Sequence, residues 1–276
     1  MSLEIERETS SRISSDVPFL ASLWIIGGVY VILILSLLIA DASYTTPSHF
    51  LKALQSKEIR YAIKLSLISC TMAAILSLWV AIPIGYLMSR YNFHGKIFFD
   101  AILDIPIVLP PLVIGLSLLI LFQTPIGRAI ESKVTITYGI PAVILAQFMV
   151  ACAFAVRAMR VSFDQLDPRQ EQVALTLGCN RNQAFWLVVL PEVRHGILTA
   201  ATLAWSRSLG EFGPILIFAG ATRMRTEVLP TTVFLELSIG NIEAAVAVSL
   251  LMVFAAVIVL IIVRIYGLKG AIKFHR

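Results

Sequence analysis

Five long stretches without a charged residue are the feature that most limits what this chain can fold into. They cover residues 17–40, 65–89, 105–127, 134–156 and 244–263, and each is 20 to 25 residues long. A helix needs about 20 apolar residues to cross the hydrocarbon core of a bilayer. Hydrophobic residues make up 58% of the chain and charged residues only 14%, which is not the composition of a soluble globular protein. The sequence therefore predicts an all-α polytopic membrane protein.

The apolar pattern predicts six membrane-spanning helices within one domain at 18–266. We expect them at about 19–40, 62–89, 101–122, 139–156, 196–221 and 244–266, with a polar tail at 1–17 and a basic tail at 267–276. The first apolar run is longer than the apolar region of a signal peptide, about 7–15 residues, and it follows an acidic tail, so we interpret it as a retained span. The mixed segment 47–60 suits a helix lying on the bilayer surface.

The third span begins with an unusual proline-rich sequence. Asp104 is followed by Ile-Pro-Ile-Val-Leu-Pro-Pro, which places prolines at positions 106, 110 and 111. Proline removes a backbone donor, so this entry is expected to be kinked or partly non-helical. Such a helix fits a path enclosed by protein better than a surface facing lipid, although a purely structural role for the prolines is the alternative.

Basic residues are distributed unequally between the two sides of the membrane. With the N-terminus in the cytoplasm, thirteen Lys and Arg residues fall in cytoplasmic segments and eight in the segments on the other side. Cytoplasmic segments of membrane proteins usually carry the excess. We therefore expect both termini in the cytoplasm, together with the long polar segment 157–194.

A short helix is predicted inside the segment 157–194. Asp167 followed by Pro168 suits a helix N-cap and first helical residue, and Gly178 suits the stop about three turns later. A helix of this kind at a membrane surface has two interpretations from its pattern alone. It is either an interfacial helix resting on lipid or a docking element for another protein.

The same segment resembles the EAA loop of ABC importer permeases. The matching residues are Glu171-Gln172-Val173-Ala174, then Gly178, and Val188-Val-Leu-Pro191 at the family spacing; the usual acidic residue of the family falls at Gln172 here, and Glu171 stands one place earlier. The resemblance implies a cytoplasmic coupling helix between spans 4 and 5 that docks on the ATP-hydrolysing subunit. It implies coupling roles for Glu171, Gln172, Ala174, Gly178 and Pro191.

Two further stretches are similar to molybdate, tungstate and sulfate permeases. They are the proline-rich entry at 104–111 and Trp205-Ser-Arg-Ser-Leu-Gly-Glu-Phe-Gly213. The resemblance implies import of an oxyanion, molybdate or tungstate first and sulfate next, across a prokaryotic cytoplasmic membrane. It also implies a homodimer, cytoplasmic cassette subunits that hold ATP and magnesium, and an extracytoplasmic substrate-binding protein, with no cofactor in this chain.

Two charges interrupt the fifth span. Arg207 and Glu211 are four residues apart, so on a helix they share a face and can pair. Charges at this depth are costly, and each is expected to face protein or water. The pair is either an architectural salt bridge or part of a gate, in which Arg207 and neighbouring hydroxyls border an anion path. The candidate gate comprises Pro106, Pro110, Pro111, Ser206, Arg207, Gly210, Glu211, Phe212 and Gly213.

Other functional classes fit the sequence less well. No GxxxxGK[ST] run is present, so the chain is not expected to hydrolyse ATP. The Cys and His residues show no metal-ligand spacing, no catalytic constellation is evident, and no nucleic-acid partner is expected. A secondary transporter working without a cassette, or an ABC permease for a different substrate, is the alternative. Arg223 and Arg225, on the predicted outer face, either attract anions or acidic groups or are simply solvated.

Overall fold

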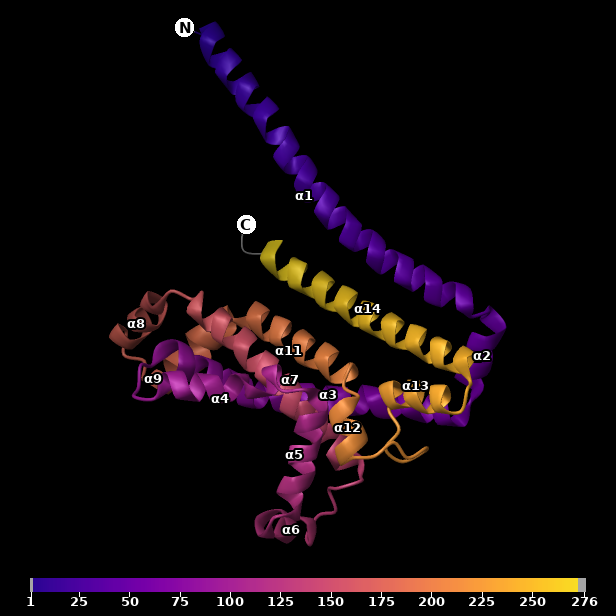
Figure 1. The fold of residues 1–276 in the computed structure, drawn as a ribbon. Helices are drawn as coiled ribbons and strands as arrows, with labels where there is room; N and C mark the ends of the chain where they lie inside the picture. Colours follow the sequence, from indigo (N-terminus) through magenta and orange to yellow (C-terminus); the bar gives the residue numbers. More distant parts are fainter. Residues whose placement is uncertain (1, 273–276) are drawn as a thin grey trace.

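The computed structural model describes the backbone of residues 2–272 and the side chains of residues 17–261, except those of residues 47 and 49. All regular elements in the described backbone are helical (Figure 1). They are α1 (Ser2–Tyr44), α2 (Pro47–Gln55), α3 (Lys57–Arg90), α4 (Lys96–Val108), α5 (Pro111–Gln123), α6 (Pro125–Glu131), α7 (Ile140–Asp164), α8 (Pro168–Thr176), α9 (Arg181–Ala184), the π-helix η1 (Phe185–Val189), α10 (Leu190–Glu192), α11 (Arg194–Leu209), α12 (Gly213–Phe218), α13 (Leu229–Ser238) and α14 (Ile242–Ile272).

Four of these helices are long and apolar enough to cross a membrane by themselves. They are Val17–Tyr44 within α1, Lys57–Arg90, Ile140–Asp164 and Ile242–Ile261 within α14. Two bent helix pairs also qualify, α4 with α5 and 181–192 with α11. If each pair forms one span, the described residues contain six, in agreement with the predicted all-α polytopic fold.

Two expected spans are not continuous helices. The third, expected at 101–122, consists of α4 and α5, between which the chain turns by 111°. The turn falls at Leu109 and Pro110, because consecutive prolines cannot continue the backbone hydrogen bonds of α4. The fifth, expected at 196–221, stops at Leu209, and helix resumes at Gly213.

The expected surface helix and tails also differ from the structure in their bounds. The surface helix α2 ends at Gln55, and Ser56 caps α3 by accepting a hydrogen bond from the N–H of Ile59 at 3.5 Å. Residues 57–60 therefore belong to α3 rather than to the surface helix. The backbone of α1 is helical from Ser2, with no break between the expected tail 1–17 and the first span. The side chains of the basic tail 267–276 lie outside the described residues.

The core is a bundle of α3, α7 and α11. These helices contact one another through small buried residues: Ala73, Ala74 and Ala81 of α3, Ala151 and Ala155 of α7, and Ala200 and Ala204 of α11. A Cβ built on Gly85 of α3 would lie 2.8 Å from Cβ of Met159 on α7, so only glycine allows this approach. Small residues let helix backbones approach closely inside a membrane, where van der Waals packing must hold the helices together.

The loop elements lie at opposite ends of this bundle (Figure 1). Helices α8 and α9 lie at the end where α3 and α7 finish and α11 begins, whereas α2 and α13 lie at the other end. Helix α1 lies apart from the bundle, beside α14, and none of its spanning window is buried. Helix α7 continues to Asp164, eight residues beyond the expected end of the fourth span, so the loop itself covers 165–193. The bundle places this loop and the break after Leu209 at the two ends of α11.

Candidate functional site

The segment 157–194 forms the predicted short helix. Asp167 caps α8, because its Oδ1 accepts a hydrogen bond from the N–H of Arg169 at 2.9 Å, and Pro168 is the first helical residue. Helix α8 ends at Thr176, and Gly178 adopts a left-handed conformation with φ of 95°. Glycine adopts positive φ without steric cost, which explains the stop at this position. The predicted cap and stop are both confirmed.

Glu171 fastens α8 to the end of α3. Its Oε1 accepts a hydrogen bond from the hydroxyl of Tyr86 at 2.5 Å, and its Oε2 lies 3.7 Å from Nε of Arg90. The Arg90 guanidinium also donates to the carbonyl of Leu166 at 2.9 Å. The side chains of Arg90 and Glu171 are only 11% and 14% exposed. Glu171 therefore faces inward and makes its polar contacts within this chain.

The exposed surface of the same segment includes four large apolar side chains among polar ones. Gln172 is exposed beside Val173, whereas Ala174 is buried against the rest of the chain. Pro191 is exposed. Large exposed side chains continue along the segment: Val173 at 56%, Leu177 at 80%, Trp186 at 59% and Leu187 at 69%. We call these four residues and Gln172 the docking face. The structure thus separates Glu171, which faces inward, from Gln172, which faces outward.

A second contact anchors the far half of the segment to α3. Asn180 and Gln183 form a capping box that begins α9, with bonds of 2.8 and 2.9 Å. Next to this cap, Arg181 donates to the hydroxyl of Tyr91 at 3.0 Å, just beyond the end of α3. Both halves of the segment are therefore tied to the same end of α3.

The candidate gate contains the predicted ion pair. Nη1 of Arg207 lies 2.8 Å from Oε1 of Glu211, and the side chains are 34% and 1% exposed. The residues do not share one helix, because α11 ends at Leu209 and Glu211 lies in the break before α12. The guanidinium carbon of Arg207 lies 5.5 Å from the centre of the Phe154 ring. Glu211 is thus enclosed, while its cation remains partly accessible.

Helices α5 and α12 meet through backbone contacts beside the break. A Cβ built on Gly213 would lie 3.2 Å from Cβ of Pro111, and one built on Gly115 would lie 2.8 Å from Cα of Pro214. The structure therefore brings Pro111 of the third span to Gly213 of the fifth. Pro106 lies within α4, across the 111° turn, and Pro110 is exposed at that turn.

Gln147 is a buried polar residue next to the gate that sequence reasoning missed. Its side chain is 1% exposed, and Nε2 donates to the carbonyl of Ser208 at 3.2 Å and to Sγ of Cys70 at 3.5 Å. Gln147 thereby joins α7 to both α11 and α3. It is the one amide side chain in the charge-free stretch 134–156, and this was the available sequence indication.

We expect Gln147→Leu to destabilise the protein by about 1–3 kcal/mol, because Leu leaves the buried Ser208 carbonyl of α11 without its donor. Thermal unfolding of the purified protein in detergent measures the loss. Ser238→Ala is the control, since the Ser238 hydroxyl is exposed and bonds only within its own helix, to Phe234; its effect should stay within about 0.5 kcal/mol. Equal stability of Gln147→Leu and the wild type would show that the Gln147 hydrogen bonds do not hold α7 to α11 and α3.

Buried carboxylates accompany the arginines of the predicted outer loop. Arg223 pairs with Glu236 at 2.9 Å, and Asn241 donates to the same carboxylate at 2.8 Å. Arg223 is thus neutralised within the chain. Burial raises the pKa of Glu227, against the opposing influence of Thr232 and Arg223. Neither acid was singled out by the sequence.

The fold and these sites define a helical membrane protein with a structured loop at one end of its core and a charged helix break further along. The family model described as "Binding-protein-dependent transport system inner membrane component" matches residues 81–268, which include both. The chain belongs to this family, the permease subunits of ABC importers of type I, in which a separate subunit hydrolyses ATP.

Several relatives carry oxyanion names. The sulfate transport system permease protein CysT of Salmonella typhimurium is 29% identical over 229 residues, which cover 82% of this chain and 83% of the relative. The probable molybdenum ABC transporter permease protein HVO_B0370 of Haloferax volcanii is 33% identical over 202 residues, 73% of each chain. The molybdate/tungstate transport system permease protein WtpB of Pyrococcus abyssi is 35% identical over 158 residues, 57% of this chain and 60% of the relative.

A solved structure supports the fold. A chain of a bacterial alginate ABC transporter, in complex with an alginate pentasaccharide-bound periplasmic protein, superposes with a TM-score of 0.72. The match covers 92% of this chain and 94% of that chain at 17% sequence identity. At this identity the likeness concerns the arrangement of helices alone.

Proposed function

We propose that this chain forms the translocation path for an oxyanion, molybdate or tungstate first and sulfate next, and that it works by alternating access driven by ATP hydrolysis in a cassette subunit. The observation that carries the proposal is the position of α11. This one helix begins at Arg194, where the segment 157–194 ends, and finishes at Leu209, beside the Arg207–Glu211 pair. Its 16 residues span about 24 Å, so a tilt at one end reaches the other.

The docking face is the proposed contact with the cassette. Val173 and Leu177 of the docking face are exposed although α8 lies outside the candidate spans, and burial against a partner would remove them from water. The contacts of Glu171 with Tyr86 and Arg90 would hold α8 on α3 when the cassette moves. ATP and magnesium belong to the cassette in this proposal, and this chain holds no cofactor.

Arg207 is the proposed contact with the anion. Sulfate, molybdate and tungstate are tetrahedral dianions, and a guanidinium presents several N–H donors in a fixed fork that suits oxyanions. The Arg207 side chain remains about one-third exposed while paired with Glu211. It therefore has donors available for a passing anion, and the buried carboxylate holds it in place.

The proposed assembly contains two copies of this chain, two cassettes on the cytoplasmic side and a binding protein outside. The excess of Lys and Arg on one side supports cytoplasmic termini and a cytoplasmic α8. The printed names of the relatives support the oxyanion. In this arrangement the membrane covers the exposed apolar face of α1.

Competition between oxyanions tests the substrate. Uptake of labelled molybdate into vesicles that contain the full transporter should be inhibited by tungstate at comparable concentration, and by sulfate at a higher one. Phosphate, also tetrahedral, and chloride serve as controls and should leave uptake unchanged. Uptake of none of the three oxyanions, with the cassettes and the binding protein present and assembled, would refute the proposed substrate class.

A further inference from the structure

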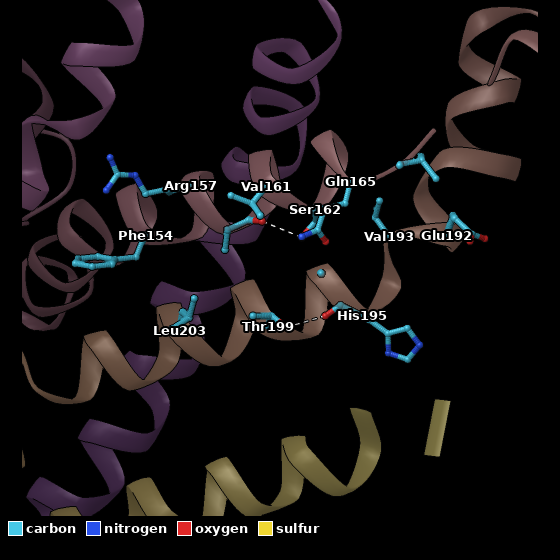
Figure 2. Close-up of a pocket in the computed structure, with 13 residues that line it drawn as sticks. Phe154, Arg157, Val161, Ser162, Gln165, Glu192, Val193, His195, Thr199 and Leu203 are labelled. Carbon is cyan, nitrogen blue, oxygen red and sulfur yellow. Dashed lines mark hydrogen bonds between the residues drawn. The ribbon is translucent and has the colours of Figure 1, made fainter. Parts of the chain in front are cut away.

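A cavity of about 640 Å³ lies between α7 and the start of α11. Figure 2 shows its lining side chains along the two helices, with Phe154 and Arg157 at one end and Glu192 and His195 at the other. Polar groups are prominent among them: Arg157, Ser162, Gln165, Glu192, His195 and Thr199. One water occupies about 30 Å³ in the liquid, so the cavity has room for an oxyanion with part of its hydration shell.

One residue that lines the cavity also contacts the candidate gate. His195, Thr199 and Leu203 line it at intervals of four residues along α11, and Arg207 is the next residue of this series. Neighbouring members of this series are adjacent on the helix surface, and each step turns about 40° around the axis, so Leu203 is the member next to Arg207. Phe154 lines the cavity and also contacts the Arg207 guanidinium, whose carbon lies 5.5 Å from the ring centre. Phe154 therefore connects the Arg207 site to the cavity, and an anion that passes this ring would enter the cavity.

Arg157 supplies a cation at the gate end of the cavity. Its Nη2 donates to Oδ2 of Asp104 at 2.8 Å, while 60% of the side chain remains exposed. A guanidinium has five N–H donors, so one bond to Asp104 leaves others available. Figure 2 shows Arg157 near Phe154 and Glu192 at the opposite end, near His195. The carboxylate of Glu192 opposes retention of an anion at that end.

We propose that this cavity is the exit vestibule of the anion path, in which Arg157 holds the oxyanion after it has passed Arg207 and before it is released beside α8. The inference rests on the proposed function, because it takes α8 as cytoplasmic and an oxyanion as the substrate. It adds a second anion-binding residue, on α7, to a path otherwise assigned to α5 and to the region from Ser206 to Gly213. A lipid headgroup phosphate bound by the same cation is an outcome of the test.

Uptake by four forms of the full transporter separates anion binding from ion pairing. Arg157→Gln should lower the rate of molybdate uptake at least about tenfold, the lower end of the effect of charge focusing in a cleft. Asp104→Asn removes the same ion pair but keeps the Arg157 cation, and uptake should stay within about twofold of the wild type. Arg160→Gln, on the same helix, loses pairs with Asp100 and Asp164 and is the matched control, also expected within about twofold.

Two results of the uptake experiment would refute the proposal that Arg157 holds the oxyanion in this vestibule. Equal losses in Arg157→Gln and Asp104→Asn would show that Arg157 serves only to hold α4 on α7. Normal uptake by Arg157→Gln would show that its charge has no role. If the wild-type transporter imports none of the oxyanions, the proposed function itself is refuted. If Arg157→Gln does not assemble, Arg157→Lys preserves the charge without the fork, and the thiol measurement below decides.

The reactivity of an introduced thiol tests anion binding in the vestibule without requiring transport. Thr199→Cys is introduced into the full complex after replacing the partly exposed Cys152 and Cys179 by alanine. In inside-out vesicles, the new thiol should react faster with an anionic than with a cationic methanethiosulfonate. Arg157→Lys should preserve this preference, and molybdate should slow the reaction. A preference unaffected by Arg157→Gln, or protection that depends on anionic lipid content and not on molybdate, would overturn the proposal.

Discussion

Gly178→Val is expected to abolish ATP-driven uptake and to weaken cassette binding at least about tenfold. The backbone at Gly178 has φ of 95°, and a β-branched residue held in that region costs about 1–3 kcal/mol. A difference of about 1.4 kcal/mol is a factor of ten in an equilibrium constant. No atom lies within 4 Å of a Cβ at this position, so a steric clash is excluded. The substitution is expected to act by changing the backbone conformation at the end of α8. Co-purification with the cassette and uptake measure it.

Two variants control for this experiment. Gly178→Asn should retain most cassette binding, because asparagine tolerates the left-handed conformation. Gly240→Val introduces the same backbone strain at the opposite end of the bundle, where φ is 79° and no atom lies within 4 Å of the added Cβ. It should bind the cassette like the wild type. Weak binding by Gly240→Val comparable to that of Gly178→Val would show that strain acts globally rather than through the docking face.

Glu211→Gln is expected to lower uptake at least tenfold while the amount of inserted, monodisperse protein stays within about twofold. Glu211 is 1% exposed and holds Arg207 at 2.8 Å. Breaking a buried ion pair costs about 3 kcal/mol, and a tenfold change corresponds to about 1.4 kcal/mol. The freed Arg207 is expected to lose its fixed position beside Phe154. Uptake normalised to inserted protein is the measurement.

The double variant Arg207→Gln with Glu211→Gln separates architecture from transport. Replacing both partners of a buried pair avoids the uncompensated charge that makes a single replacement costly. If the pair is only architectural, the double variant should restore uptake. If Arg207 binds the anion, the double variant should be stable and still fail to transport. Normal uptake by either variant would remove the pair from the mechanism.

The spanning helices could be predicted because hydrocarbon thickness alone fixes their length. Charge-free stretches locate α3, α7 and α14, with ends that differ from the helix bounds by up to nine residues. The helix α8 was also predictable, since its cap and its stop are local and lie at Asp167 and Gly178. These features depend on residues close together in the sequence.

The direction of side chains and the angles between helices could not be predicted in the same way. The prolines after Ile105 indicated a break, but the 111° turn depends on how α5 packs on α12. Glu171 faces inward because Tyr86 and Arg90 lie under it, about 80 residues earlier in the chain. Gln147 likewise acquires its role only from α11 and α3. Such long-range partners leave no periodic pattern in a single sequence.

The central claim is that energy for transport reaches this chain from a cassette subunit through α8. It is tested most directly by loading proteoliposomes with ATP and measuring uptake of labelled molybdate, supplied with the binding protein, by this chain with and without its cassette partner. The account predicts uptake that requires the cassette and hydrolysable ATP and is lost in Gly178→Val. Full uptake by the chain alone, driven by an ion gradient, would contradict it.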